Sequence, residues 1–322
     1  MKFENIYIED EIKSLKKTKS ILSRIKYKNI IFCDKYTEIF NPKNQNFRIQ
    51  KINPNIILAK KYGKFILKTP PKFNIGFKYN YYFSHMLNCV YDCKYCFLQG
   101  MFNSANFLVF VNYEDFFKEI DCILTKNPNK KICFFSGYDC DSLALEKITN
   151  FLNSFLTFFE QRKNAFLEVR TKSTNIEVFK KIKPINNVII AYSLNPEEII
   201  QKYEQKTPTF AKRLESLHLL QSLGWRVGIR FDPIFVSHNN VNIYNRFVEN
   251  IFLKINPNTL HSVTIGEFRM PNNFLNKILK IRTNDSLEFL ELHNNKLKKK
   301  ESYSLFKKKL RTFVSARKIY EN

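Results

Sequence analysis

Short apolar runs alternate with amphipathic stretches over the middle of the chain. From residue 75 onward, runs rich in Ile, Val, Phe and Tyr predict six strands, at 75–82, 131–135, 166–171, 188–193, 226–231 and 262–265. Between the strands, apolar residues recur at helical spacing and predict helices at 114–125, 144–161, 175–183, 196–203 and 209–224. Strands that alternate with helices favour an α/β fold with a parallel sheet.

Six such units without a glycine-rich nucleotide fingerprint favour a partial (β/α)6 TIM-like barrel over a doubly wound sheet. Segment 1–74 mixes a basic helical pattern with strand-like runs, and we expect a small N-terminal α/β subdomain there. The barrel is expected to span 75–275, with its chemistry at the carboxyl ends of the strands. Segment 276–322 carries Lys runs at 296–300 and 307–309, and we expect a basic helical C-terminal extension.

Composition points to a charged, folded protein. The 322 residues with 44% hydrophobic content allow a sizeable core and exclude a disordered chain. Fifty-three Lys and Arg against 29 Asp and Glu give a formal net charge of +24, which favours a polyanionic partner, most simply a nucleic acid such as DNA. A biased genome composition is the alternative, because Lys, Asn, Ile and Phe are all abundant.

Targeting signals are missing from the sequence pattern. The first fifteen residues carry four acidic side chains and no apolar core of a secretory signal. No stretch approaches the ~20 apolar residues that span a bilayer. We therefore expect a cytoplasmic protein without a membrane partner, in which cysteines stay reduced unless they hold a metal.

Three of the seven cysteines, Cys89, Cys93 and Cys96, fall within eight residues at the spacing CxxxCxxC. Thiolates this close repel one another unless a positive group binds them, and a metal is the natural candidate. Three thiolates would hold three irons of a [4Fe–4S] cluster and leave the fourth iron open to a small chelating molecule. The alternative is structural zinc, with His85 as a fourth ligand.

The cysteine motif, with aromatic Tyr95 before its last cysteine, resembles the signature of the radical S-adenosylmethionine superfamily. The wider string 93–99, Cys-Lys-Tyr-Cys-Phe-Leu-Gln, resembles more narrowly the spore photoproduct lyase family. Further stretches resemble later motifs of that family, in the same order, over roughly residues 5–275. These stretches lie at 136–146, 171–172, 192–198, 204–213, 228–233 and 266–269.

The resemblance implies a [4Fe–4S] cluster and S-adenosylmethionine as cofactors. It implies that the reduced cluster cleaves S-adenosylmethionine to a 5′-deoxyadenosyl radical, which then repairs a methylene-bridged thymine dimer in DNA. Such an enzyme also needs an electron donor such as a ferredoxin or flavodoxin. The cofactors carry the radical chemistry, and the protein orients them and excludes water.

The resemblance also assigns roles to single residues. It implies that Tyr95 lies beside the cluster and that Lys172 and Ser193 bind S-adenosylmethionine, with Asn195 nearby; alternatively, Ser193 and Asn195 cap the next helix. A Lys172 cation suits the methionyl carboxylate of that cofactor. Asp232 and Arg269 end late strands, and we expect them either on the substrate side or in structural ion pairs.

Two positions depart from the family pattern. The resemblance implies a hydrogen-donor cysteine in the second-strand loop, and Tyr138 stands at that position. Cys140 stands where the family has a serine near the cofactor, and Phe97 replaces a second tyrosine. Either Cys140 or Tyr138 is then the donor, or the enzyme acts on another substrate. A basic nucleic-acid-binding protein with a structural metal is the non-enzymatic alternative.

Overall fold

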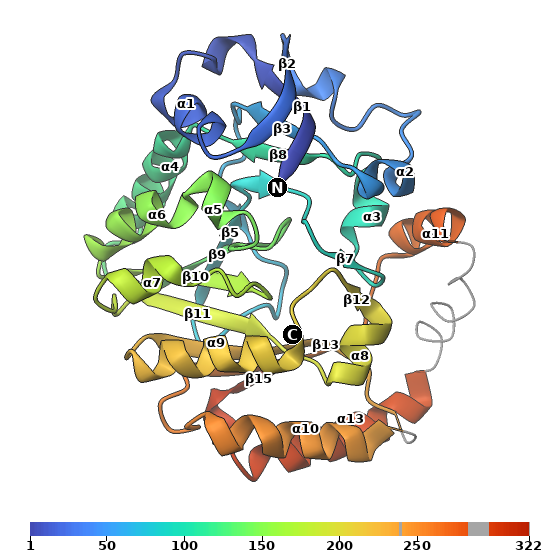
Figure 1. Cartoon of the computed structure of the whole chain (residues 1–322). Coiled ribbons are helices and arrows are strands. Elements are labelled where there is room, and N and C mark those ends of the chain that lie inside the picture. Colours follow the sequence, from blue (N-terminus) through green and yellow to red (C-terminus); the bar gives the residue numbers. More distant parts are fainter. Residues whose placement is uncertain (238–239, 283–295, 322) are drawn as a thin grey trace.

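Six parallel strands form the centre of the molecule and curl into an open half-barrel (Figure 1). The computed structural model describes residues 1–237, 240–282 and 296–321. The strands follow one another across the sheet in chain order, as β5 (Tyr79–Phe83), β9 (Ile132–Ser136), β10 (Ala165–Thr171), β11 (Val188–Ser193), β13 (Arg226–Ile234) and β14 (Ser262–Glu267). All six predicted strands and the partial-barrel fold class are confirmed. The first strand begins later than the predicted 75–82, because Gly76, with φ of +102°, interrupts the extended chain.

Helices cover the outer face of this sheet. They are α4 (Tyr113–Thr125), α5 (Glu146–Thr149), α6 (Phe151–Glu160), α7 (Glu177–Lys181), α8 (Glu197–Tyr203), α9 (Phe210–Ser222) and α10 (Val241–Lys254). Each of the longer helices turns an apolar stripe inward, and Phe155, Leu217 and Ile251 on three of them are fully buried. Burying one such side chain stabilises the fold by about 1.5–3 kcal/mol.

A second sheet packs beside the half-barrel. Its strand order is β2 (Lys26–Cys33), β1 (Lys2–Glu9), β3 (Ile56–Ala59), β8 (Phe107–Phe110) and β6 (Met86–Leu87), and only β6 is antiparallel to its neighbour. The connected helices are α1 (Lys16–Leu22) and α2 (Phe47–Ile52), with single turns η1 (Asp10–Ile12) and η2 (Tyr36–Glu38). The N-terminal unit expected for 1–74 therefore shares its sheet with β6 and β8, which follow the first barrel strand.

The C-terminal segment ends in a strand. After α11 (Asn272–Ile281) and α13 (Lys296–Arg311), a turn η5 (Ala316–Lys318) leads into β15 (Ile319–Glu321), which pairs in parallel with β14. At the opposite edge, β4 (Leu67–Lys68) pairs antiparallel with β5. The expected helical extension is thus helical in part, and residues 283–295 of it lie outside the described residues. None of the helices in the described ranges is both long and apolar enough to cross a membrane.

Candidate functional site

The three clustered cysteines lie on one loop that follows β5 and β6. A two-residue strand within this loop, β7 (Asp92–Cys93), pairs antiparallel with β12 (Glu204–Gln205), so that Cys93 stands opposite Glu204. The backbone N–H of Lys94 also donates to the carbonyl of Tyr203 at 2.8 Å. The loop is therefore fixed to the segment that follows β11, at the carboxyl ends of the barrel strands.

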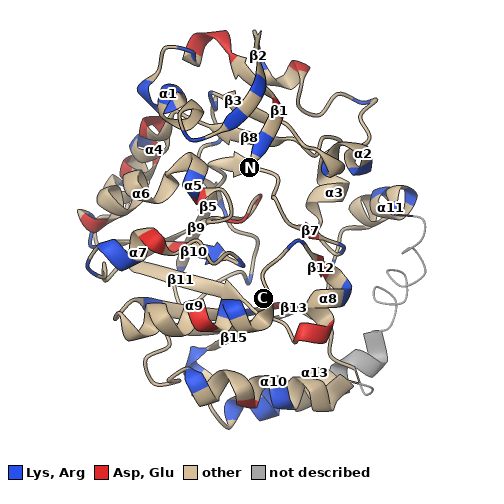
Figure 2. Cartoon of the chain, in the orientation of Figure 1, with Lys and Arg blue, Asp and Glu red and all other residues tan. Residues whose placement is uncertain are grey.

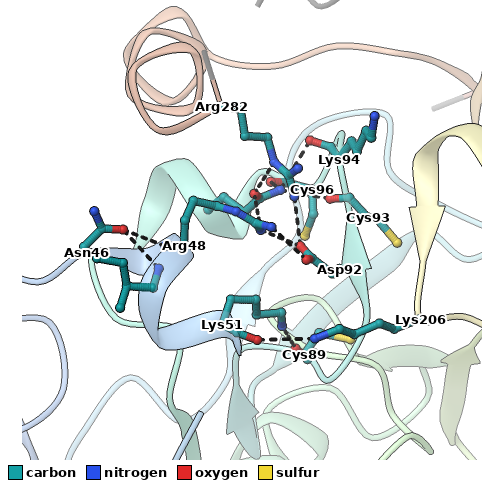
Figure 3. A network of polar contacts seen from close by, with 12 residues as sticks. Asn46, Arg48, Lys51, Cys89, Asp92, Cys93, Lys94, Cys96, Lys206 and Arg282 are labelled. Atoms are coloured by element: carbon teal, nitrogen blue, oxygen red, sulfur yellow. Dashed lines mark hydrogen bonds and ion pairs between the residues drawn. The ribbon is translucent and has the colours of Figure 1, made fainter. Parts of the chain in front are cut away.

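Asp92 anchors the cysteine loop to two distant parts of the chain (Figure 3). Its carboxylate accepts two hydrogen bonds from Arg48 of α2, at 2.7 and 3.0 Å, and one from Arg282 after α11, at 2.9 Å. Burial alone would raise the pKa of Asp92. The two guanidinium groups lower it by more than burial raises it, so the net shift is downward. The buried carboxylate thus stays ionised and holds two cations against the loop.

Gln99 and Lys51 complete this clamp. The Gln99 side chain follows the loop in α3 (Leu98–Met101), donates to the Cys93 carbonyl at 2.9 Å and accepts from Arg282 at 2.7 Å. The buried Lys51 amine donates to the Cys89 carbonyl, and burial lowers its pKa. Lys206 in turn donates to the Lys51 carbonyl at 3.3 Å. The loop backbone is therefore held by side chains rather than by regular secondary structure.

The donor chemistry of the loop fits an iron–sulfur cluster. Cys89, Cys93 and Cys96 are free thiols and line one small hollow of the surface together. Burial raises all three pKa values, that of Cys89 to about 12, while Lys51 lowers the values of Cys89 and Cys96. Soft sulfur donors of this kind bind iron in clusters and lose their protons on ligation.

His85 does not join the three cysteines. Its ring is buried and stacks on Phe151, with centroids 3.9 Å apart, and burial lowers its pKa to about 3. Across the described ranges 1–237, 240–282 and 296–321, no three His, Cys, Asp or Glu side chains gather tightly enough to hold a single metal ion. His85 thus belongs to the aromatic core, and a Cys₃His zinc site is not formed.

A buried carboxylate, Glu204, collects several of the predicted cofactor residues. Its Oε1 accepts from the Tyr95 hydroxyl and from Asn195 Nδ2, the latter at 3.0 Å. Its Oε2 lies 2.6 Å from Arg213 Nη2, and both side chains are fully excluded from solvent. Burial raises the pKa of Glu204, but Lys172 and Arg213 outweigh it and keep the net pKa low. The carboxylate is therefore ionised and orients Tyr95 and Asn195.

Lys172 and Ser193 lie beside this carboxylate. Lys172 directly follows β10, and its Nζ is 5.8 Å from the Tyr95 ring centre. Burial lowers the pKa of Lys172, but Glu204 and Cys93 more than compensate, and the net shift is upward. Ser193 ends β11 and is buried, and its carbonyl accepts from Arg213 at 3.2 Å. The side chains expected around S-adenosylmethionine thus converge next to the cysteine loop.

Tyr138 lies in an aromatic group at the mouth of the half-barrel. Its ring stacks on Tyr82, with centroids 4.3 Å apart, and meets Phe97 at 5.9 Å. Burial raises the pKa of Tyr138, whereas the nearby charges of Arg269 and Arg170 lower it.

The two expected substrate-side residues lie near Tyr138. The charges of both Arg269 and Asp232 act on the Tyr138 hydroxyl. The Asp232 carboxylate rests on Gly266, where an added Cβ would come within 2.5 Å of its Oδ1. Beneath them, buried Glu168 pairs with Arg230 at 2.8 Å and with Arg170 at 2.9 Å, filling the interior of the half-barrel.

Cys140 points to a different environment from Tyr138. It is buried in the apolar cluster of the N-terminal sheet, together with Met86, Val109 and Leu145. Burial raises the pKa of Cys140 well above its usual range, and the neighbouring Cys89 adds to this rise. Cys140 is thus near the cysteine loop, and its thiol does not share the aromatic mouth.

The sequence assigns no role to several residues of this site. Glu204 and Arg213 bound the stretch 204–213, which resembles a family motif, but the sequence does not indicate that the two side chains pair. Arg48 and Arg282 lie far from the cysteines in sequence and look like any other basic residue of this chain. Of the residues that hold the loop, Gln99 is predictable from sequence, because it lies three residues after Cys96.

An open parallel half-barrel with a three-cysteine loop at its carboxyl-end mouth is the architecture of radical S-adenosylmethionine proteins. The family model described as "Spore photoproduct lyase" matches residues 72–310. The chain belongs to the spore photoproduct lyase family.

Individual relatives agree with this assignment. The chain is 22% identical over 209 residues to a spore photoproduct lyase of Clostridium acetobutylicum, covering 65% of this chain and 62% of the relative. It is 22% identical over 177 residues to that of Bacillus subtilis, covering 55% and 52%. The matches thus span about half to three fifths of these curated relatives.

A solved structure shows the same fold over nearly the whole chain. It is a spore photoproduct lyase variant with bound AdoMet and dinucleoside spore photoproduct, with a TM-score of 0.83 at 15% identity, covering 99% of this chain and 98% of that one.

Proposed function

We propose that this protein is a radical S-adenosylmethionine enzyme that repairs a methylene-bridged thymine dimer in DNA. The observation that carries the proposal is the convergence of two groups at the carboxyl ends of the strands. One group is the clamped loop with Cys89, Cys93 and Cys96, and the other is the set of side chains around Glu204. The net charge of +24 suits a DNA substrate.

In this proposal the three cysteines bind the cluster and the neighbouring side chains bind its partner cofactor. When bound, a reduced [4Fe–4S] cluster supplies the electron that cleaves S-adenosylmethionine to methionine and a 5′-deoxyadenosyl radical. The Lys172 ammonium pairs with the methionyl carboxylate, and Ser193 and Asn195 donate hydrogen bonds to polar groups of the same molecule. Tyr95, held by Glu204, fixes one wall of this site.

We infer that Tyr138, rather than Cys140, ends the reaction. The bound cofactors would supply the radical that takes a hydrogen atom from the lesion, and breakage of the bridging carbon–carbon bond would leave a thymine-centred radical in front of Tyr138. The Tyr138 hydroxyl gives this radical a hydrogen atom and becomes a tyrosyl radical. One electron from a ferredoxin or flavodoxin and one proton then restore the phenol. The position of Tyr138 beside Tyr82, and of Cys140 in the apolar cluster, supports this assignment.

The position of Tyr138 at the mouth also favours a second candidate, a radical enzyme of this family with another substrate. Of the three rings Tyr138, Tyr82 and Phe97, the two tyrosines carry a phenol hydrogen and Phe97 carries none. Such a mouth would also accept another aromatic or nucleic-acid substrate. The two candidates share radical formation and differ in the product.

An anaerobic assay with the methylene-bridged thymine dinucleotide tests the proposal. The reconstituted protein is incubated with a strong reductant and S-adenosylmethionine, and both 5′-deoxyadenosine and restored dinucleotide are measured. We expect both products from the wild type. Tyr138→Phe, which keeps the ring stack, should form 5′-deoxyadenosine but lose most of the repair, whereas Cys140→Ala should retain both.

The outcomes separate the candidates. If 5′-deoxyadenosine forms without repair, the substrate is a different molecule. If an iron-loaded sample forms neither product, the radical assignment is wrong. If Cys140→Ala loses repair and Tyr138→Phe retains it, the thiol is the donor.

A further inference from the structure

A basic groove runs along segment 68–81 to the end of the half-barrel opposite the cysteine loop. It consists of two adjoining hollows of about 680 and 480 Å³ that share Gly76, Phe77, Lys78 and Tyr79. Six exposed cationic residues line the two hollows: Lys68, Lys72, Lys78, Lys130, Lys131 and Arg226. Among the described residues that line it there is no Asp or Glu.

The second hollow lies at the amino-terminal ends of the parallel strands. Lys131, Arg226 and His261 directly precede or begin β9, β13 and β14. These strands contain 5, 9 and 6 residues, so their two ends are roughly 17–30 Å apart at about 3.3 Å per residue. The second hollow is therefore separate from the site at the carboxyl ends. The first hollow extends toward the mouth, because Phe73 in its lining has its ring centre 6.3 Å from that of Tyr138.

This concentration of charge serves no evident structural purpose. Basic residues are spread over most elements of the chain (Figure 2), but elsewhere many pair with carboxylates, as Arg162 does with Asp121 at 2.5 Å. In the groove six like charges surround a hollow without acidic partners in its lining, and their repulsion opposes folding. The amino-terminal face of a barrel ordinarily contributes to stability. A ligand that neutralises the charges accounts for the arrangement.

Aromatic rings form the floor between these cations. Phe77 lies 4.7 Å from Phe166 and stacks parallel to His261 at 5.9 Å, which fixes its ring. Tyr79 is half-buried, with Lys130 Nζ 4.7 Å from its ring centre. Rings interleaved with cations are the arrangement by which proteins bind single-stranded nucleic acid, since bases stack on the rings and phosphates meet the cations.

We propose that this groove binds a single-stranded segment of nucleic acid through its phosphate backbone, outside the cysteine loop and the side chains around Glu204. An acidic electron-donor protein is the other class of polyanion that suits a basic surface. The aromatic rings between the cations distinguish the two, because bases stack on rings, whereas an acidic protein surface needs only the cations. The geometry therefore favours the nucleic acid.

Fluorescence anisotropy with a labelled single-stranded oligonucleotide tests the proposal. We expect Lys78→Glu/Lys131→Glu to weaken binding roughly tenfold or more and to lower the slope of log K against log salt by about 1.4, since each lost phosphate contact removes about 0.7. The matched control is Lys16→Glu/Lys19→Glu, which makes the same charge change at exposed positions of α1. This control should bind within about twofold of the wild type. Thermal unfolding by circular dichroism verifies that both variants fold.

The outcomes are distinguishable from those for the proposed function. Lys78 and Lys131 directly precede β5 and β9, at the ends of these strands away from the mouth, so the groove variant should form 5′-deoxyadenosine at the wild-type rate with a thymine dinucleotide. Equal weakening in both double variants would overturn the groove proposal and assign the effect to net charge. Binding of an acidic ferredoxin that is lost only in the groove variant, without loss of oligonucleotide binding, would also overturn it.

Discussion

Glu204 and Cys93 stand opposite each other across the short antiparallel ladder of β12 and β7. The carboxylate of Glu204 is also ion-paired to Arg213 inside the protein. The backbone position of one cysteine is therefore coupled to a buried charge pair. Disturbing that pair should affect both stability and the geometry of the loop.

Removing Arg213 should strongly destabilise the fold. Arg213→Met leaves the Glu204 carboxylate buried without its ion-pair partner, and we expect a loss of about 3–5 kcal/mol in the free energy of unfolding. Urea denaturation followed by circular dichroism measures it. The double variant Glu204→Gln/Arg213→Met should recover a large part of the loss. An equal loss in both variants would show that packing, rather than charge, dominates.

Breaking the clamp on Asp92 should impair metal binding more than folding. Arg48→Met removes two hydrogen bonds to the carboxylate, and we expect less iron and acid-labile sulfide per chain after anaerobic reconstitution. The control is Arg162→Met, which breaks a two-point pair with Asp121 outside the site. If both variants bind iron equally, the clamp does not organise the loop.

Gly100 should tolerate no side chain. An added Cβ would lie 2.6 Å from the Phe274 carbonyl and 2.7 Å from its Cα, and backbone cannot swing away as a side chain can. Gly100→Ala should therefore push α11 from α3, lower the melting temperature and weaken the hold of Arg282 on Asp92. Gly63→Ala is the comparison, because a Cβ at this position meets open space. Its only cost in folding free energy comes from the positive φ of 58° and is about 1–2 kcal/mol. A melting temperature of Gly100→Ala at or above that of Gly63→Ala would contradict the prediction.

Glu146 should make stability depend on pH in the neutral range. Burial raises its pKa to about 7, although the N–H groups of Leu152 and Phe151, Lys17 and Arg24 oppose the shift. Unfolding returns the pKa to 4.5, so the stabilisation present below pH 4.5 is lost as the pH rises through 7. The lost free energy amounts to roughly 3 kcal/mol for a shift of this size.

Urea denaturation between pH 5 and 8 compares the wild type with Glu146→Gln, which keeps an oxygen acceptor and does not titrate. The wild type should lose stability relative to the variant across this range. Burial lowers the pKa of Lys17 to about 8, so Lys17 makes the stability rise with pH, but only above about pH 8. Parallel curves for the two proteins would exclude Glu146 as the titrating group.

The sequence predicts the half-barrel well because its strands contain short runs rich in apolar and β-branched residues, although Glu168, Arg170 and Arg230 carry charge into the interior. β9 and β11 are buried at every residue, so each appears as an uninterrupted apolar run. β1 escapes prediction because Glu4 and Asn5 separate its buried Phe3 from Ile6 and Ile8. β15 escapes because it is short and follows a lysine-rich helix.

The candidate site is predictable only in part, for a geometric reason. Spacing alone identifies the cysteine loop, because its residues are neighbours in sequence. Tyr138 and Cys140 differ by two positions, and periodicity does not reveal that the Gly137 turn, with φ of +86°, sends them into different environments. The pairing of Arg48 and Arg282 with Asp92 depends on tertiary contacts over long sequence separations.

The clamp on Asp92 also constrains when the site forms during synthesis. Arg282 emerges from the ribosome about 190 residues after Asp92, which is roughly 10–40 s at a translation rate of about 5–20 residues per second. Until then the loop lacks one of its two guanidinium partners, and the last barrel strand, β14, has only just been made. Insertion of iron and sulfide is therefore expected to follow translation of nearly the whole chain. A nascent chain stalled before α11 should have a cysteine loop that Arg282 does not yet hold in place.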